Sequence, residues 1–156
     1  MRWVLVASLV LLAGCGASGS SEKKAAAPPP PPPVKDDRLL LLPAHQTSAK
    51  LVPDHLLAKM PLPGGTIGDY DDGGKKYQLF IIETDTAQDA AFLLLDFKPL
   101  LTNPTYISYM GGYFGPDAAT GTPIWVFAKS KYLAGVVGLA RDPADEIARE
   151  LAARLH

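Results

Sequence analysis

Hydrophobic and polar positions divide the chain into three parts with different patterns. Residues 3–13 form an apolar run that is interrupted only by Ser8. Residues 16–38 are Gly, Ser, Ala, Pro and charged side chains, with almost no large apolar group to bury. From residue 39 onward, short apolar stretches alternate with turn-forming residues, which is typical of a globular domain. The pattern therefore predicts a leader, a spacer and a single folded domain at 39–156.

A short N-terminal helix is predicted near the start of this domain. Within residues 53–60, the side chains of Leu56, Leu57 and Met60 would share one side of a helix, and Pro61 would end it. We expect these three side chains to point into the core.

Five further segments have the composition of β-strands. They cover residues 66–70, 75–83, 105–110, 124–128 and 132–139. The Asp-Asp-Gly-Gly run at 71–74 predicts a tight hairpin turn, because glycine readily adopts the positive φ that such turns need. Residues 77–82 are apolar at consecutive positions, so this strand should be buried on both faces and lie inside the sheet.

Two longer helices are predicted, one in the middle of the domain and one at its C-terminus. Thr86 and Asp89 resemble a capping box, and Pro99 would close the helix that follows them. Asp142 before Pro143 is typical of a helix start. Helices placed among hairpins predict an α+β fold. We expect a mainly antiparallel sheet of about five strands with both main helices packed on one face, plus the short N-terminal helix.

Charge and cysteine content exclude several classes of protein. The domain has ten basic and thirteen acidic side chains, a formal net charge of −3, and they do not cluster. A protein that binds the phosphate backbone needs a basic face, so nucleic acid is not the expected partner. A single cysteine allows no intramolecular disulfide, no multi-cysteine zinc site and no Cys-x-x-Cys redox motif.

The apolar run ends in a specific motif. Residues 12–15 are Leu-Ala-Gly-Cys, after an apolar core that is too short to span a bilayer but fits an export signal. This motif resembles the lipobox of bacterial lipoproteins. The resemblance implies a signal peptide at 1–14, cleavage between Gly14 and Cys15, and a lipid on Cys15 that anchors the protein to the membrane. The alternative is a secretory signal with an incidental free cysteine.

The position in the envelope follows from the same resemblance. In bacteria with two membranes, an aspartate after the lipidated cysteine commonly retains a lipoprotein in the inner membrane. Gly16 stands there in this chain. The resemblance therefore favours the outer membrane, with the domain facing the periplasm or the cell surface.

Residues 15–38 are expected to form the lipidated start of a disordered Ser/Ala/Pro-rich linker. Such a composition cannot offset the entropy lost on ordering. The six prolines at 28–33 would form a stiff polyproline II rod of roughly 19 Å. The linker would thus hold the domain away from the membrane; a docking site for a proline-binding domain is the alternative.

The order of elements from about residue 51 to 155 also resembles, loosely, a family of small exported bacterial domains of uncharacterised function. The resemblance lies in Gly64-Gly65 before the first hairpin, an apolar central strand with an alanine-containing helix after it, and a late hairpin before the last helix. It implies no activity and no catalytic residue.

The densest group of aromatic residues is a candidate binding loop. Tyr109, Tyr113 and Phe114 lie beside Gly111 and Gly112. Aromatic side chains on a glycine-rich loop can line a groove for a sugar or a peptide. The competing interpretation is that they fill a core or fasten the loop.

The sequence predicts no catalytic residues, no metal site and no cofactor. His45, His55 and His156 lack the spacing of zinc ligands. The acidic run at 69–74 matches only part of a calcium-binding loop, because Phe80 stands where a bidentate glutamate is needed.

The favoured hypothesis is a membrane-anchored cell-envelope lipoprotein whose domain binds an envelope protein or another envelope component without catalysis. The alternative is an envelope enzyme or small-ligand receptor whose site the sequence does not reveal. A deep pocket with carboxylates of shifted pKa would favour the alternative, and a shallow exposed apolar surface would favour binding.

Overall fold

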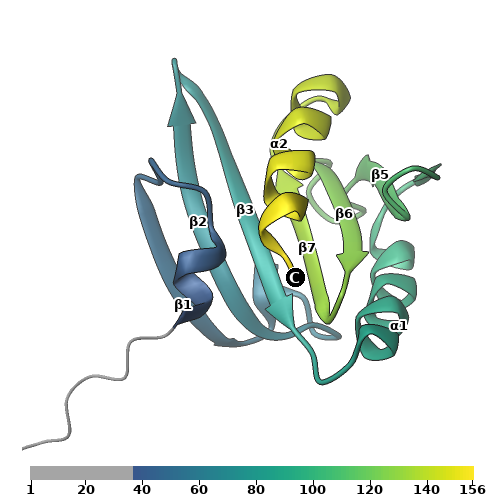
Figure 1. Cartoon of the computed structure of the whole chain (residues 1–156). Helices are drawn as coiled ribbons and strands as arrows, with labels where there is room; N and C mark the ends of the chain where they lie inside the picture. The colour runs from purple at the N-terminus through teal and green to yellow at the C-terminus, as the bar shows by residue number, and fades with distance from the viewer. Residues whose placement is uncertain (1–36) are drawn as a thin grey trace, which may run out of the picture. The chain divides into compact units, whose positions relative to one another are not determined.

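A computed structural model describes residues 37–156, in which one antiparallel sheet is flanked by helices (Figure 1). The strands are β1 (Ser48–Asp54), β2 (Pro63–Asp72), β3 (Lys75–Glu83), β4 (Thr105–Ile107), β5 (Gly112–Pro116), β6 (Pro123–Lys129) and β7 (Tyr132–Val137). The α-helices are α1 (Ala87–Phe97) and α2 (Arg141–Arg154), and the 3-10 helices are η1 (Asp37–Leu41), η2 (Leu56–Ala58) and η3 (Lys98–Leu100).

The sheet consists of two meanders joined at one seam. The strand order is β1-β2-β3-β7-β6-β5-β4, and every neighbouring pair is antiparallel. The chain runs through β1, β2 and β3, crosses to the far edge through α1, and returns through β4, β5 and β6 to β7. Strand β3 therefore pairs with β7 inside the sheet, as the apolar run at 77–82 predicted.

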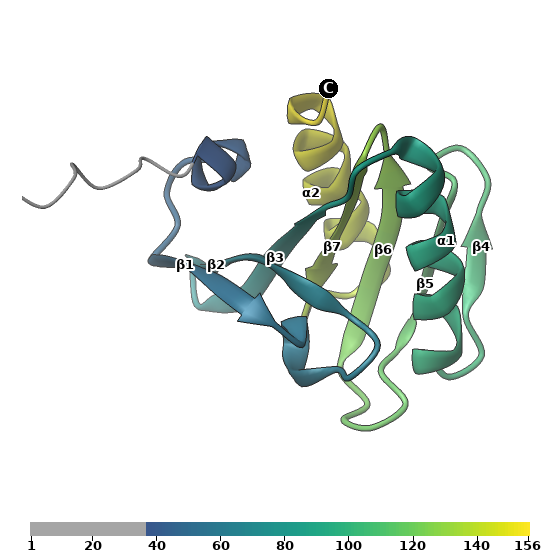
Figure 2. The same ribbon diagram turned by 90° about the horizontal axis from the view of Figure 1, so that it is seen from below.

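The two α-helices pack on opposite faces of the sheet, so the expectation that both would cover one face is wrong (Figure 2). Leu79 and Ile81 of β3 belong to the core cluster that includes α2, whereas Phe80 and Ile82 belong to the one that includes α1. Both helices contact β6 and β7. The physical reason is that the inner strands are apolar on both sides, so a single helical layer would leave one apolar face in water.

The number of strands was also predicted wrongly: the sheet has seven strands and the fold is mainly β, not α+β with about five strands. Strand β5 was missed because Gly112 and Gly115 look like strand breakers. A Cβ at Gly112 would collide with the carbonyl oxygen of Val126 and lie 2.8 Å from Cβ of Phe127. Glycine here permits the close approach of β5 to β6.

The predicted N-terminal helix at 53–60 is not formed, and only the three-residue 3-10 segment η2 lies in this range. Strand β1 continues through Pro53 at the edge of the sheet, where proline needs no hydrogen-bond partner for its nitrogen. His55 and Leu57 then have positive φ angles of 51° and 56°, which end any regular helix. Leu56 is fully buried as expected, but the Met60 side chain is 80% exposed.

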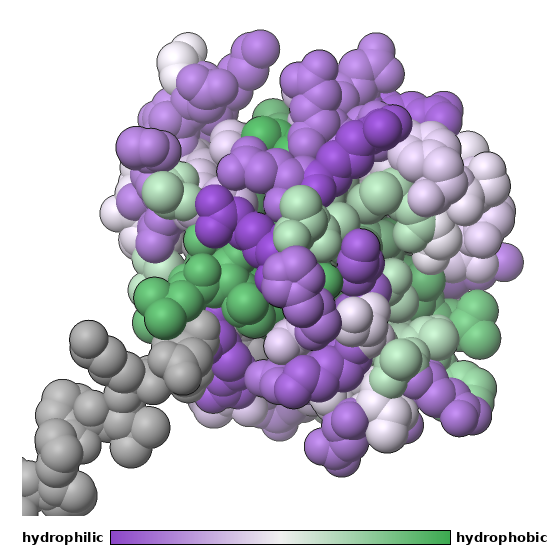
Figure 3. Space-filling model, in the orientation of Figure 1, coloured by the Kyte–Doolittle hydropathy of each residue, from purple (hydrophilic) through white to green (hydrophobic). Residues whose placement is uncertain are grey.

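The edge of the sheet near β1 is covered by short segments rather than by α-helices. Leu42, directly after η1, is buried against Gly68 of β2 on the α2 side. Leu56 and Leu62 are buried on the α1 side. The outward side of η1 stays apolar, with Leu40 73% exposed, and forms a patch beside the polar outer face of α2 (Figure 3).

The N-cap role of Thr86 in α1 is confirmed, and it supports a stability prediction. The Thr86 hydroxyl accepts a hydrogen bond of 3.1 Å from the backbone N–H of Asp89. We expect Thr86→Ala to lower the free energy of unfolding by about 1 kcal/mol, because one helix N–H loses its partner. Urea unfolding followed by circular dichroism would measure this. Gln88→Ala, on the exposed side of the same turn, is the matched control, and an equal loss in both variants would contradict the capping role.

Candidate functional site

The β2–β3 hairpin ends in the two-residue turn that the sequence predicted. Gly73 and Gly74 have φ angles of 58° and 88°, and Asp72 pairs with Lys75 across the turn. The Asp71 carboxylate accepts a hydrogen bond of 2.9 Å from the N–H of Gly74. The acidic run at 69–74 is thus strand and turn, as expected from its flanks. Within residues 37–156, no three His, Cys, Asp or Glu side chains are grouped as metal ligands.

Two tyrosines stack beside this turn, on the face of the sheet that α2 covers. Tyr70 and Tyr77 are cross-strand partners, and their rings are nearly parallel with centroids 5.1 Å apart. The buried Tyr70 hydroxyl donates a 2.8 Å hydrogen bond to the carbonyl oxygen of Pro43, and burial raises the pKa of Tyr70 to about 12. Tyr77 is half-buried, and its hydroxyl has no hydrogen bond within residues 37–156.

A groove runs past Tyr77 between the hairpin and α2. It consists of a cavity of about 310 Å³ and an adjoining one of about 150 Å³, which share Asp72, Tyr77 and Ile147. The larger cavity also touches Tyr70, and the smaller one does not. We call this combined cavity the tyrosine groove.

The rim of the tyrosine groove is acidic. Four exposed carboxylates line it: Asp71, Asp72, Glu146 and Glu150. Burial is the main cause that raises the pKa of Tyr77, and the negative charges of Asp72 and Glu150 raise it further. The groove therefore combines an apolar wall with more acidic than basic side chains, since Lys75 is the one Lys or Arg that lines it and Glu150 is paired with Arg154.

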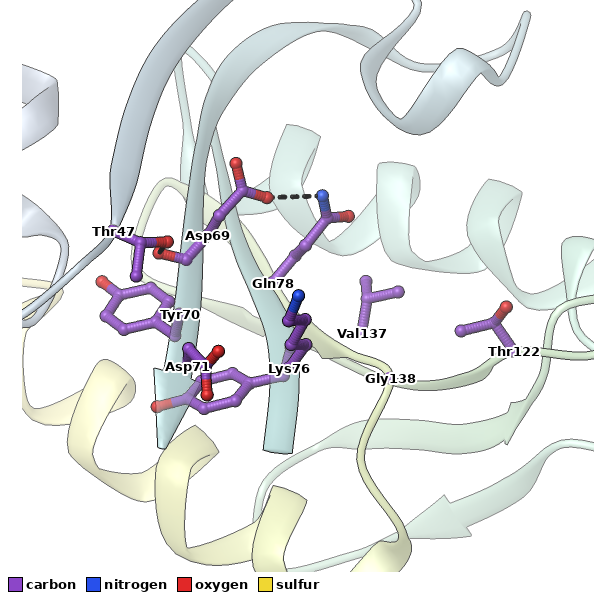
Figure 4. A pocket seen from close by; sticks show the side chains of 10 residues that line it. Thr47, Asp69, Tyr70, Asp71, Lys76, Gln78, Thr122, Val137 and Gly138 are labelled. Atoms are coloured by element: carbon purple, nitrogen blue, oxygen red, sulfur yellow. Dashed lines mark hydrogen bonds between the residues drawn. The ribbon is translucent and has the colours of Figure 1, made fainter. Parts of the chain in front are cut away.

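A second cavity, of about 620 Å³, lies beside the same hairpin and shares Tyr70, Asp71 and Tyr77 with the tyrosine groove (Figure 4). Asp69, Gln78 and Val137 are neighbours across β2, β3 and β7 and form its floor. Asp69 accepts hydrogen bonds from the Ser48 hydroxyl and from Nε2 of Gln78, the latter at 2.7 Å. These bonds lower the pKa of Asp69, so the cavity holds a well-satisfied carboxylate.

The structure does not gather the three residues of the candidate binding loop on one surface. Tyr113 and Phe114 are neighbours in β5 and point to opposite faces of the sheet. Lys98 lies 5.3 Å from the ring centroid of Tyr113, and Phe114 packs on Trp125 at 5.9 Å. Tyr109 lies in the turn between β4 and β5 and is 58% exposed. Whether any of the three contacts a partner stays a prediction.

Tyr109 fastens this turn to α2. Its hydroxyl donates a 2.6 Å hydrogen bond to Asp145, and Arg149 lies 4.8 Å from its ring centroid. Asp145 and Arg149 also form an ion pair, with 3.0 Å between Nη2 and Oδ2. Partial burial raises the pKa of Asp145, but the hydrogen bonds from Tyr109 and Arg149 outweigh it and hold the pKa below its usual value.

Gly14 and Cys15, the predicted cleavage and lipid-attachment residues, lie outside the described residues. The tyrosine groove was missed at the sequence level, although a signal was present. Tyr70 and Tyr77 are each three positions from the turn glycines, which places them opposite each other in a two-residue hairpin. No comparable signal in the sequence predicts that α2 lies beside these two tyrosines.

No protein-family model, no curated protein and no solved structure matches this chain. Its function is therefore inferred from its own residues.

Proposed function

We propose that this chain is a membrane-anchored envelope lipoprotein whose folded domain acts by binding an envelope component. The motif Leu12-Ala13-Gly14-Cys15, between an apolar run and a proline-rich spacer, carries this proposal. Each buried methylene of an attached acyl chain adds about 0.8 kcal/mol of membrane affinity, so two or more chains on Cys15 give a stable anchor.

The architecture supports a binding role. Lipid anchoring restricts the domain to a layer next to the membrane, which raises its local concentration toward any partner in that layer. The domain offers an open groove with an apolar wall and a charged rim at the β2–β3 hairpin, a combination found in recognition sites. None of the helices within residues 37–156 is long and apolar enough to cross a membrane.

Anchoring predicts that Cys15→Ala removes all acyl label from the chain. Cells that express the full-length protein would be fed an alkyne-bearing fatty acid, and the purified chain would be tested for label and for its partition into the membrane fraction. We expect both to be lost in Cys15→Ala and kept in Ser20→Ala, a matched substitution in the spacer. Label that survives in Cys15→Ala would refute lipidation at this residue.

Partner binding is tested by crosslinking in intact envelopes. Wild-type chain should give a discrete crosslinked species, and Cys15→Ala should give much less because it loses the local concentration.

The alternative role, a small-ligand receptor, has one supporting observation, since the cavity beside Asp69 has a volume of about 620 Å³ and small-ligand pockets measure roughly 300–1,000 Å³. Absence of crosslinks together with thermal stabilisation by a small-molecule extract of the envelope would favour that role.

A further inference from the structure

Tyr77 and the exposed Tyr106 differ from three other tyrosines of this domain. Three tyrosine rings carry a cationic side chain over the ring: Tyr109 with Arg149, Tyr113 with Lys98 and Tyr132 with Lys131. Within residues 37–156, no Lys or Arg of the chain lies over the Tyr77 ring. One side of this ring stacks on Tyr70. The smaller cavity of the tyrosine groove touches Tyr77 but not Tyr70, so it borders the other side.

The surroundings of that free side of Tyr77 are negative. Asp72 and Glu146 line the smaller cavity, and neither belongs to an ion pair within residues 37–156. Lys75 is the one cation that lines it. A cation over an aromatic ring gains roughly 0.5–2 kcal/mol, with the larger value when it leaves water. Nearby carboxylates add to that attraction.

The rest of the groove suits an aliphatic stem. Ile147 and Leu139 contribute apolar wall to the smaller cavity, and Leu79 forms the floor of the larger one. Lysine and arginine bury their methylene groups against such surfaces while the charged end reaches a polar partner. The two cavities adjoin along α2, so the groove is too long to be filled by one small amine.

We propose that the tyrosine groove binds a segment of the partner protein that carries lysine or arginine, with one side-chain cation over the Tyr77 ring between Asp72 and Glu146. The segment runs along α2 toward Tyr70. This inference rests on the proposed function, since it names the chemistry of the envelope component that the domain binds.

The test titrates the full-length chain, purified in detergent, with an acetylated and amidated peptide of alternating glycine and lysine. Binding is followed by NMR through the ring and amide signals of Tyr77 and Ile147. We expect saturable shifts that weaken at high salt, and none with the peptide in which glutamate replaces lysine. Tyr77→Phe should bind as wild type, because the Tyr77 hydroxyl has no partner within the domain and the aromatic face is kept. Tyr77→Leu should bind at least fivefold more weakly.

A second variant keeps the proposal testable if Tyr77→Leu unfolds. Asp72→Asn/Glu146→Gln changes two exposed carboxylates and should weaken peptide binding at least tenfold. Its matched control, Asp85→Asn/Asp96→Asn, makes the same change of net charge away from the groove and should leave binding unaltered. Equal weakening by both double variants would show non-specific attraction to an acidic protein and overturn the proposal.

Two further outcomes are decisive. Binding of n-butylammonium as tightly as the peptide would overturn the assignment to a polypeptide segment. The titration needs neither membrane nor envelope partner. A failure to bind the peptide would therefore overturn the groove assignment alone, whereas absence of acyl label and of crosslinks from the wild-type chain would overturn the proposed function.

Discussion

Gly135→Ala is expected to lower the free energy of unfolding by about 3 kcal/mol, near the upper end for overpacked cores. Gly135 lies in β7, opposite Phe80 of β3. A Cβ at this position would collide with the carbonyl oxygen of Trp125 and lie 2.6 Å from two ring carbons of Phe80. The Phe80 ring in turn stacks on Phe97 of α1 at 5.9 Å, so the added methyl group would also displace the helix.

The measurement is thermal and urea unfolding of the full-length chain, where we expect the melting temperature to fall by roughly 10 °C. Gly121→Ala is the matched control. Gly121 has a φ of 73°, and a Cβ there meets no atom within 4 Å, so only backbone strain of about 1–2 kcal/mol is added. An equal loss of stability in the two variants would show that the close packing of Phe80 over β7 is not the reason for glycine at position 135.

Lys59→Met is expected to cost about 3 kcal/mol at neutral pH. Nζ of Lys59 lies 2.7 Å from Oδ2 of Asp117, and the two side chains are only 10% and 9% exposed. The pair ties the segment after β1 to the turn between β5 and β6. Removal of Lys59 leaves the Asp117 carboxylate nearly buried, with the N–H of Ala119 and the side chain of Thr120 as its remaining hydrogen-bond partners. Lys131→Met, which breaks the more exposed pair with Glu83, should cost less than about 1 kcal/mol.

The effect of Lys59→Met should depend on pH. Partial burial raises the pKa of Asp117, but the hydrogen bonds from Lys59 and Ala119 outweigh it, so the pKa lies below its usual value. A lowered carboxyl pKa contributes stability above the unfolded-state value of about 4, and this contribution is lost as the pH falls. The gap between wild type and Lys59→Met should therefore narrow below about pH 4.

A second substitution separates the charge from the loss of packing. Lys59→Met/Asp117→Asn removes both charges and keeps an acceptor for Ala119. We expect it to regain at least half of the stability lost by Lys59→Met, because the uncompensated carboxylate is gone. A double variant as unstable as the single one would mean that the Lys59 stem, rather than the ion pair, provides the stabilisation.

Local signals predicted local structure well in this chain. The turn at Gly73-Gly74 and the Thr86 cap depend on the conformations of a few residues, and both are present. Strands β1 and β5 were missed because Pro53 and Gly112 are tolerated only in particular places, at a sheet edge and under a neighbouring backbone. The sequence shows that a proline or a glycine is present, but it does not show which strand will lie beside that residue.

The face of the sheet that each α-helix covers could not be predicted from the sequence of that helix alone. An amphipathic helix shows which of its sides is buried, and it does not show which side of a sheet will receive it. The information lay in β3, where consecutive apolar residues such as Leu79 and Phe80 require cover on both faces. For the same reason the tyrosine groove was only half predictable. The pairing of Tyr70 with Tyr77 follows from the turn, but the contribution of Ile147 requires the position of α2.

The seam between β3 and β7 also has a consequence for the order of folding. Phe80 meets Gly135 only after the chain between them has closed into a long loop, whereas each meander is held by neighbours along the chain. Loop closure costs entropy before the paired strands return any stability. We therefore expect the hairpins to form first and the pairing of β3 with β7 to limit the rate. Until that step, the edges of two half-sheets are open to pairing with other chains.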